Sequence, residues 1–165
     1  MNILKTGLVL FLSVWLFACG SDETPQFSKG QTTPVFTLKK LEGGTNSFPA
    51  DFKGKIVTVR FWADWCPFCK TEMKEIEPIY KKYQGKGLVI LAVNVRQDKK
   101  TAAAFLKDMN ISYDVLLDEE GNVARDYGVA GLTTTFIFDR NGKLYTRILG
   151  ESTPEVFEKI VKELL

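Results

Sequence analysis

The strongest constraint on the fold is a β-branched and aromatic run at residues 56–62, followed almost at once by an amphipathic segment at 67–83. The first run predicts a strand, and the second predicts a helix because its apolar residues recur at helical spacing: Met73, Ile76, Ile79, Tyr80 and Tyr83. A nearly continuous apolar run at 88–95 predicts a buried parallel strand. Strand, helix and parallel strand in this order predict an α/β fold.

The rest of the chain extends this unit into one domain over residues 35–165. A hairpin is predicted at 35–38 and 45–48 around Gly43-Gly44, and a second at 134–138 and 143–149 around Asn141-Gly142. The other expected elements are helices at 101–109, 122–127 and 154–165 and a short strand at 115–117. Together they predict an α/β sandwich in which helices flank a mixed central sheet, with an N-terminal β-hairpin extension.

The N-terminus has the pattern of an export signal over residues 1–18. The apolar stretch from Gly7 to Ala18 is shorter than the about 20 residues that a membrane-spanning helix needs. Its end, Leu16-Phe17-Ala18-Cys19, resembles the bacterial lipoprotein box, which implies that Cys19 becomes the lipid-modified first residue of the mature protein. A plain secretory signal cut near Ala18 and a retained anchor are the alternatives, and all three place the domain outside the cytoplasm. Residues 19–34, rich in Ser, Thr, Gly and Pro, predict a flexible tether.

Composition excludes several classes of function. The sequence contains no histidine, so a Ser-His-Asp triad, a Cys-His nucleophile and a histidine-ligated metal are all absent. The 22 Lys and Arg residues are scattered and the net charge is +2, so no concentrated basic stripe for nucleic acid is present.

The motif that carries chemistry is Cys66-Pro67-Phe68-Cys69, between the predicted strand and helix. Disulfide exchange needs an attacking thiolate and a second thiol that resolves the mixed disulfide. A position at a helix N-terminus favours the thiolate of Cys66, so Cys66 is predicted as the nucleophile and Cys69 as the resolving thiol. A structural disulfide and half of a zinc site are the alternatives.

The run from Phe61 to Cys69 resembles the active-site segment of thioredoxin-like proteins. The N-terminal hairpin and the strand containing Ala92-Val93-Asn94-Val95 look like the TlpA/ResA/CcmG branch, which consists of membrane-anchored, extracytoplasmic thiol–disulfide oxidoreductases. This resemblance implies a thioredoxin-like sandwich, a catalytic pair Cys66 and Cys69, and a third catalytic residue, Glu72, that moves protons to and from the pair.

Two positions depart from the pattern of this branch. Arg60 occupies a place where thioredoxins carry a buried Asp, and a guanidinium is not buried without a partner, so we expect an ion pair between Arg60 and Glu72 that weakens proton transfer by Glu72. The alternative is that Arg60 extends to solvent. Thr133 stands where the family has a cis-proline, and since a non-proline cis bond costs ~2.5–4 kcal/mol, the Leu132–Thr133 bond is expected to be trans.

The same resemblance predicts the residues that contact substrate: Trp65, Pro67, Phe68, Leu132 and Thr133. It implies protein disulfides as clients, among them apoproteins of cytochrome c maturation, and electrons from a membrane reductase of the DsbD/CcdA kind. No cofactor is expected beyond the redox-active disulfide, and no metal. A peroxiredoxin-like peroxidase and a non-enzymatic metal-binding lipoprotein are the alternatives, although the Thr or Ser that the peroxidase pattern places three residues before the cysteine is Ala63 here.

Overall fold

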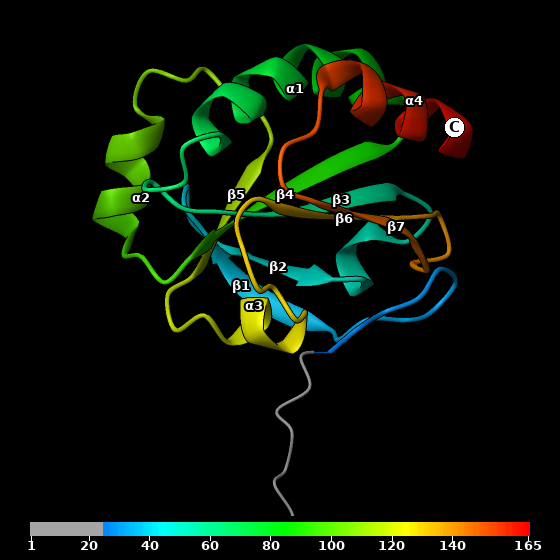
Figure 1. Cartoon of the computed structure of the whole chain (residues 1–165), viewed down its shortest axis with the longest axis horizontal. Helices are drawn as coiled ribbons and strands as arrows, with labels where there is room; N and C mark the ends of the chain where they lie inside the picture. Colours follow the sequence, from blue (N-terminus) through cyan, green and yellow to red (C-terminus); the bar gives the residue numbers. More distant parts are fainter. Residues whose placement is uncertain (1–24) are drawn as a thin grey trace, which may run out of the picture.

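A seven-stranded mixed sheet organises the chain (Figure 1). The computed structural model describes residues 25–165. Its strands are β1 (Phe36–Lys40), β2 (Thr45–Phe48), β3 (Ile56–Trp62), β4 (Leu88–Val95), β5 (Asp114–Asp118), β6 (Thr134–Phe138) and β7 (Leu144–Leu149). Its helices are α1 (Cys69–Tyr83), α2 (Lys99–Leu106), α3 (Asn122–Asp126) and α4 (Pro154–Leu164). Each element predicted from the sequence is present.

The order of the strands explains why the central runs are so apolar. The sheet runs β2-β1-β5-β4-β3-β6-β7, with β3, β4 and β5 parallel and the remaining neighbours antiparallel. Strand β3 has a partner on each side, and all seven of its residues are buried. The mixed sheet and the N-terminal hairpin confirm the predicted fold class.

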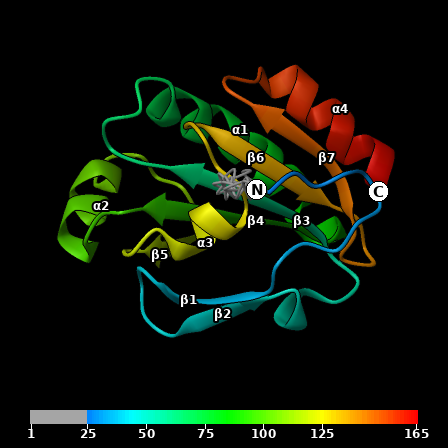
Figure 2. The ribbon, with the colours of Figure 1, turned by 60° about the horizontal axis from the view of Figure 1, so that its bottom comes forward.

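Helices cover both faces of the sheet, and side chains alternate between the two cores. Figure 2 shows α1 and α4 behind the sheet and α3 in front of it. On β3, Val57, Val59 and Phe61 pack with the α3 side. Trp62 packs with α1 and α2 on the other side, where its ring stacks on Phe105 with centroids 5.1 Å apart. Because side chains alternate along a strand, Arg60 lies on the same face as Trp62 and is directed toward α1.

Helices α1 and α2 have ends that differ by two or more residues from those predicted, because apolar spacing defines the face of a helix better than its ends. Helix α1 begins at Cys69 and not at Pro67. Helix α2 covers residues 99–106 and not 101–109, since the carboxylate of Asp98 accepts a hydrogen bond from the backbone N of Thr101 at 2.7 Å and so caps the helix earlier.

The predicted flexible tether is in part a segment packed on the domain. Phe27 packs against the ring of Tyr127 with centroids 6.1 Å apart, and the backbone N of Gly30 donates to the carbonyl of Leu144 at 2.7 Å. A single aromatic side chain and a few backbone hydrogen bonds therefore fix residues 25–34. The predicted signal at 1–18, and Cys19, lie outside the described residues. Within residues 25–165, no helix has the length and apolar character needed to span a membrane.

Candidate active site

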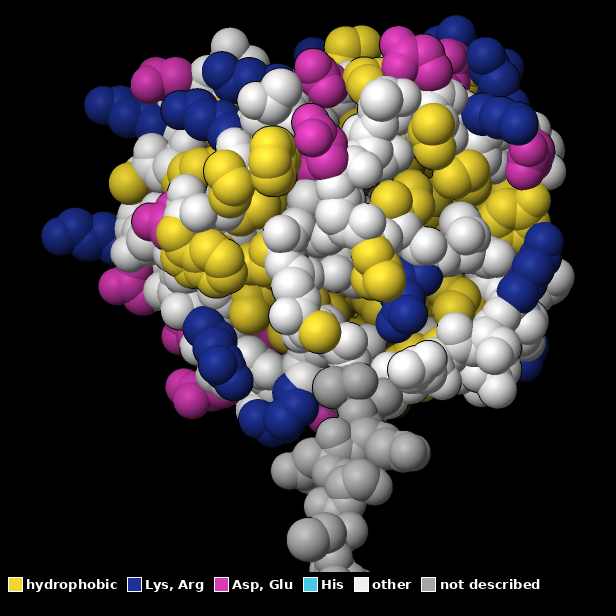
Figure 3. Space-filling model, viewed as in Figure 1, with side chains coloured by type: hydrophobic (Ala, Val, Ile, Leu, Met, Phe, Trp, Pro, Cys, Tyr) yellow, Lys and Arg dark blue, Asp and Glu magenta, His cyan; other side chains and the backbone are white. Residues whose placement is uncertain are grey.

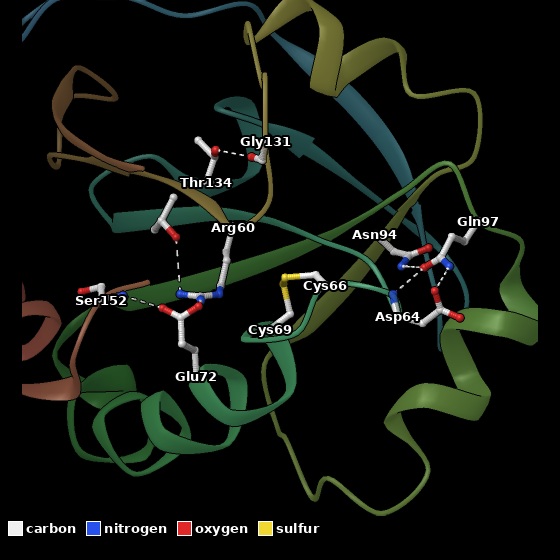
Figure 4. Close-up of a disulfide and its surroundings, with 11 residues drawn as sticks. Arg60, Asp64, Cys66, Cys69, Glu72, Asn94, Gln97, Gly131, Thr134 and Ser152 are labelled. Atoms are coloured by element: carbon white, nitrogen blue, oxygen red, sulfur yellow. Dashed lines mark hydrogen bonds and ion pairs between the residues drawn. A yellow bond between two sulfur atoms is a disulfide. The ribbon is translucent and has the colours of Figure 1, made fainter. Parts of the chain in front are cut away.

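The two cysteines close a turn between β3 and α1 (Figure 4). Cys66 and Cys69 form a disulfide with Cα atoms 5.5 Å apart, and the backbone N of Cys69 donates to the carbonyl of Cys66 at 3.3 Å. Cys69 is fully buried within the first turn of α1, whereas Cys66 retains 2% of its surface. Both cysteines are therefore buried in this form, and Cys66 keeps the small exposed remainder. The order of attack, Cys66 before Cys69, stays a prediction.

A polar network fixes the turn that leads to Cys66. The side-chain oxygen of Gln97 accepts from the backbone N of Asp64 at 3.0 Å and from Nδ2 of Asn94 at 2.8 Å. Its Nε2 donates to the carboxylate of Asp64. These contacts attach the turn to the end of β4. The sequence reasoning missed both amides, although Asn94, the one strongly polar residue of the apolar run at 88–95, was a usable signal.

Arg60 and Glu72 form a buried ion pair beside the disulfide, as predicted. Figure 4 shows the two side chains extending toward one another from β3 and α1. Arg60 is 2% exposed and Glu72 is 1% exposed. The second oxygen of Glu72 accepts from the backbone N of Ser152 at 2.8 Å, and Nη1 of Arg60 is 3.4 Å from the hydroxyl of Thr135. The pair therefore joins β3, α1, β6 and the segment before α4.

Within residues 25–165, Arg60 and Glu72 have no second acidic side chain at hydrogen-bond distance. Tyr113 is buried nearby, and its hydroxyl donates to the carbonyl of Met73 at 2.8 Å. Burial raises the pKa of Tyr113 well above its usual value, so this hydroxyl stays neutral. Within residues 25–165, Nε of Arg60 has no hydrogen-bond partner. Arg60 thus depends mainly on Glu72 for compensation of its charge.

The Leu132–Thr133 peptide bond is cis, so the predicted trans geometry is wrong. Hydrogen bonds hold the backbone on both sides of this bond. The hydroxyl of Thr134 donates to the carbonyl of Gly131 at 2.6 Å, and the carbonyl of Thr133 accepts from the backbone N of Gly150 at 2.8 Å. Thr133 as a whole is buried, so its predicted contact with substrate stays a prediction.

The other predicted substrate residues lie around the cysteine turn. Trp65 is 68% exposed and Phe68 is 49% exposed, and Pro67 between the cysteines is also exposed. Leu132 is partly buried and packs against the core cluster that contains both cysteines. Figure 3 shows apolar side chains gathered over this region. Their role in binding substrate stays a prediction.

The described residues hold no group of three or more His, Cys, Asp or Glu side chains placed to bind a metal ion. Cys66 and Cys69 are the two cysteines of this part of the chain, and both are engaged in the disulfide. The arrangement provides reversible two-electron exchange between one sulfur pair and another.

Comparison with known proteins agrees with this chemistry. Residues 29–147 match the AhpC/TSA family. The chain is 35% identical to the thiol-disulfide oxidoreductase ResA of Bacillus thuringiensis subsp. konkukian, over 97% of this chain and 98% of that protein, and 35% identical to ResA of Geobacillus thermodenitrificans, over 93% and 90%.

Solved structures give the same result. The fold is similar to StoA from Bacillus subtilis, with a TM-score of 0.68 and 25% identity over 79% of this chain and 98% of that one. It is also similar to a thioredoxin-family thiol:disulfide interchange protein from Chlorobium tepidum, with a TM-score of 0.72 and 26% identity over 84% and 99%. The cysteine turn, the sheet and these matches place the chain in the AhpC/TSA family and, within it, among the ResA-type thiol–disulfide oxidoreductases.

Proposed function

We propose that this protein reduces disulfides in exported proteins. The observation that carries the proposal is the position of Cys66, which lies just before helix α1 and forms a disulfide with Cys69, the first residue of that helix. The intervening residues, Pro67 and Phe68, supply neither a charge nor a side-chain proton donor. The thiolate therefore receives little stabilisation from this dipeptide, which favours a reductant over a strong oxidant.

Cys66 and Cys69 are sufficient to reduce a client disulfide with electrons and protons in balance. In the reduced protein, the thiolate of Cys66 attacks one sulfur of a client disulfide, and the other client sulfur leaves and takes a proton. The thiolate of Cys69 then attacks the Cys66 sulfur, so the second client sulfur leaves, is protonated and completes a client dithiol. Cys66 and Cys69 end as the disulfide seen in the structure. Two electrons and two protons from a donor restore the dithiol.

Glu72 is proposed to influence these proton transfers because it lies one helical turn after Cys69, on the same buried face of α1. The ion pair with Arg60 argues against a role of Glu72 as a simple proton carrier. The guanidinium of Arg60 and the backbone N of Ser152 both stabilise the charged carboxylate.

The reduction potential of the Cys66–Cys69 couple tests the direction of electron flow. We expect a value well below the about −120 mV of a strong disulfide oxidant, in the range of about −200 to −270 mV that reducing thioredoxin-like proteins occupy. The measurement is equilibration with glutathione or dithiothreitol followed by thiol alkylation. In cells, alkylation should trap the pair mainly as the dithiol if a membrane reductase of the DsbD/CcdA kind supplies electrons. A potential near −120 mV would refute the reductase assignment.

The site of action is proposed to be the bacterial cell envelope, on its extracytoplasmic side, with apoproteins of cytochrome c maturation among the clients. The support is the similarity to ResA and StoA together with the export signal of the sequence. We propose that lipid on Cys19 anchors the domain.

Changing Cys19 to serine is expected to move the protein from the membrane fraction to the soluble extracytoplasmic fraction, because the thiol that carries the lipid is lost. Cell fractionation and immunoblotting measure this. The Ser21→Ala variant, which leaves the lipoprotein box intact, serves as the matched control. Unchanged membrane association of a C19S protein that has lost residues 1–18, as its size on the immunoblot shows, would exclude lipid on Cys19 as the anchor.

A further inference from the structure

A groove of about 770 Å³ lies beside the cysteine turn. Trp65, which directly precedes Cys66, and Leu132, which forms the cis bond with Thr133, both line it. Its remaining wall comes from the end of β4, from α3 and from the segment between α3 and β6. The surface is mostly apolar but holds two guanidinium groups, those of Arg96 and Arg125. Figure 3 shows the corresponding apolar area with basic side chains at its lower edge, toward α3.

The position of Arg96 is set by its backbone conformation and by the space that Gly121, which has no side chain, leaves for it. It is a non-glycine residue with a left-handed backbone (φ 56°), and its N–H donates to the carbonyl of Asp118 at 2.9 Å. A Cβ added at Gly121 would lie 2.6 Å from Nε of Arg96. The Cγ, Cδ and Nε atoms of Arg96 therefore pack against Gly121, in a position that any larger residue there would crowd. A strained backbone in such a place often marks a functional position.

The charge of Arg96 is not compensated within residues 25–165. Arg96 forms no ion pair there. The nearby carboxylate of Asp118 is buried and accepts from the backbone N of Val123 and of Ala124 at 3.2 and 2.8 Å, so it serves as the cap of α3. Arg125, in contrast, donates to the side chain of Asn122 at 2.7 Å.

The groove as a whole also has a positive excess. Its lining contains two guanidinium groups and one carboxylate, that of Asp126. An apolar surface with an uncompensated, pre-positioned guanidinium complements a polypeptide that presents apolar residues and a carboxylate.

We propose that Arg96 binds a carboxylate of the client, so that the preferred substrates carry an Asp or Glu close to the disulfide that Cys66 attacks. This inference rests on the proposed function. Arg96 and Trp65 line the same groove, and Trp65 directly precedes Cys66, so a client seated in the groove lies next to the cysteine turn. Arg96 thereby selects among clients and takes no part in sulfur exchange.

Single-turnover reduction of two matched peptides tests the proposal. Each peptide contains one internal disulfide and apolar flanks, and they differ only in a Glu or a Gln beside the cysteine. The reduced full chain is mixed with each peptide at low salt, and the reaction is followed by the tryptophan fluorescence of the protein. The second-order rate constant is obtained for each peptide. We expect the Glu peptide to react on the order of tenfold faster, the effect of one charge-assisted hydrogen bond.

Variants locate the effect. R96Q is expected to lower the rate ratio to about twofold or less, and R96K to retain part of it. K159Q, which removes an exposed charge on α4, should leave the ratio unchanged. High salt should reduce the ratio in the wild type. If R96Q does not fold, the wild-type protein alone provides the test: a Glu-to-Gln rate ratio that persists at high salt overturns the proposal.

Other outcomes have distinct meanings. Equal rates for both peptides, or a ratio unaffected by R96Q, would refute recognition by Arg96 while leaving the reductase function intact. If neither peptide is reduced, the proposed function itself is wrong. Asp22 and Glu23 precede Pro25, which lines the groove, so the D22N/E23Q variant tests the chain's own acidic pair. If both peptides react faster with that variant, Arg96 binds Asp22 or Glu23 of its own chain and not a carboxylate of the client, and the proposal is overturned.

Discussion

Replacing Cys66 with serine is expected to reduce insulin-disulfide turnover to the uncatalysed rate, a loss of at least on the order of 1,000-fold. The reason is that a serine hydroxyl is almost fully protonated at neutral pH and cannot form a disulfide, so neither the attack nor the mixed intermediate exists. The measurement is insulin reduction with dithiothreitol as the electron source, corrected for the reagent alone.

The matched variant is Cys69→Ser. It keeps the attacking sulfur and lacks the resolving one, so it should accumulate a mixed disulfide between Cys66 and the client, visible on a non-reducing gel. The order of attack predicted here is reversed if C66S forms that adduct and C69S does not. If both variants keep wild-type turnover, the cysteine pair is not the reacting group.

Replacing Arg60 with methionine is expected to lower the free energy of unfolding by about 3–5 kcal/mol. Methionine fills a similar volume, but it leaves the carboxylate of Glu72, which is 1% exposed, buried without an opposite charge. Urea unfolding of the oxidised protein measures the change. An exposed control, Lys39→Met on β1, should alter stability by no more than about 0.5 kcal/mol.

A double variant separates the loss of charge balance from a packing defect. In R60M/E72Q neither side chain is charged, and the amide oxygen can still accept from the backbone N of Ser152. Most of the stability lost in R60M should therefore return. A double variant as unstable as R60M would mean that packing around Arg60, and not its charge, stabilises this region. An R60M protein within about 1 kcal/mol of the wild type would contradict the importance of the ion pair.

The sequence by itself determined the order and type of the elements and the location of the chemistry. Strand β3 was predictable from its run of β-branched and aromatic residues, and helix α1 from apolar residues that recur at helical spacing. The Cys66–Cys69 pair was identifiable because its function depends on spacing within one turn. The ion pair of Arg60 with Glu72 was also predictable, since a charge in the middle of a buried strand requires a partner nearby.

Only the tertiary structure decided features that depend on residues distant in sequence. The Leu132–Thr133 bond is cis although its local preference is trans, and the carbonyl of Thr133 bonds the distant Gly150. The network around Gln97 and the groove beside Arg96 arise where the ends of β4 and the cysteine turn meet. A local pattern reports the energetics of a few neighbouring residues, whereas the partners of a side chain across the sheet are set by how the whole chain packs.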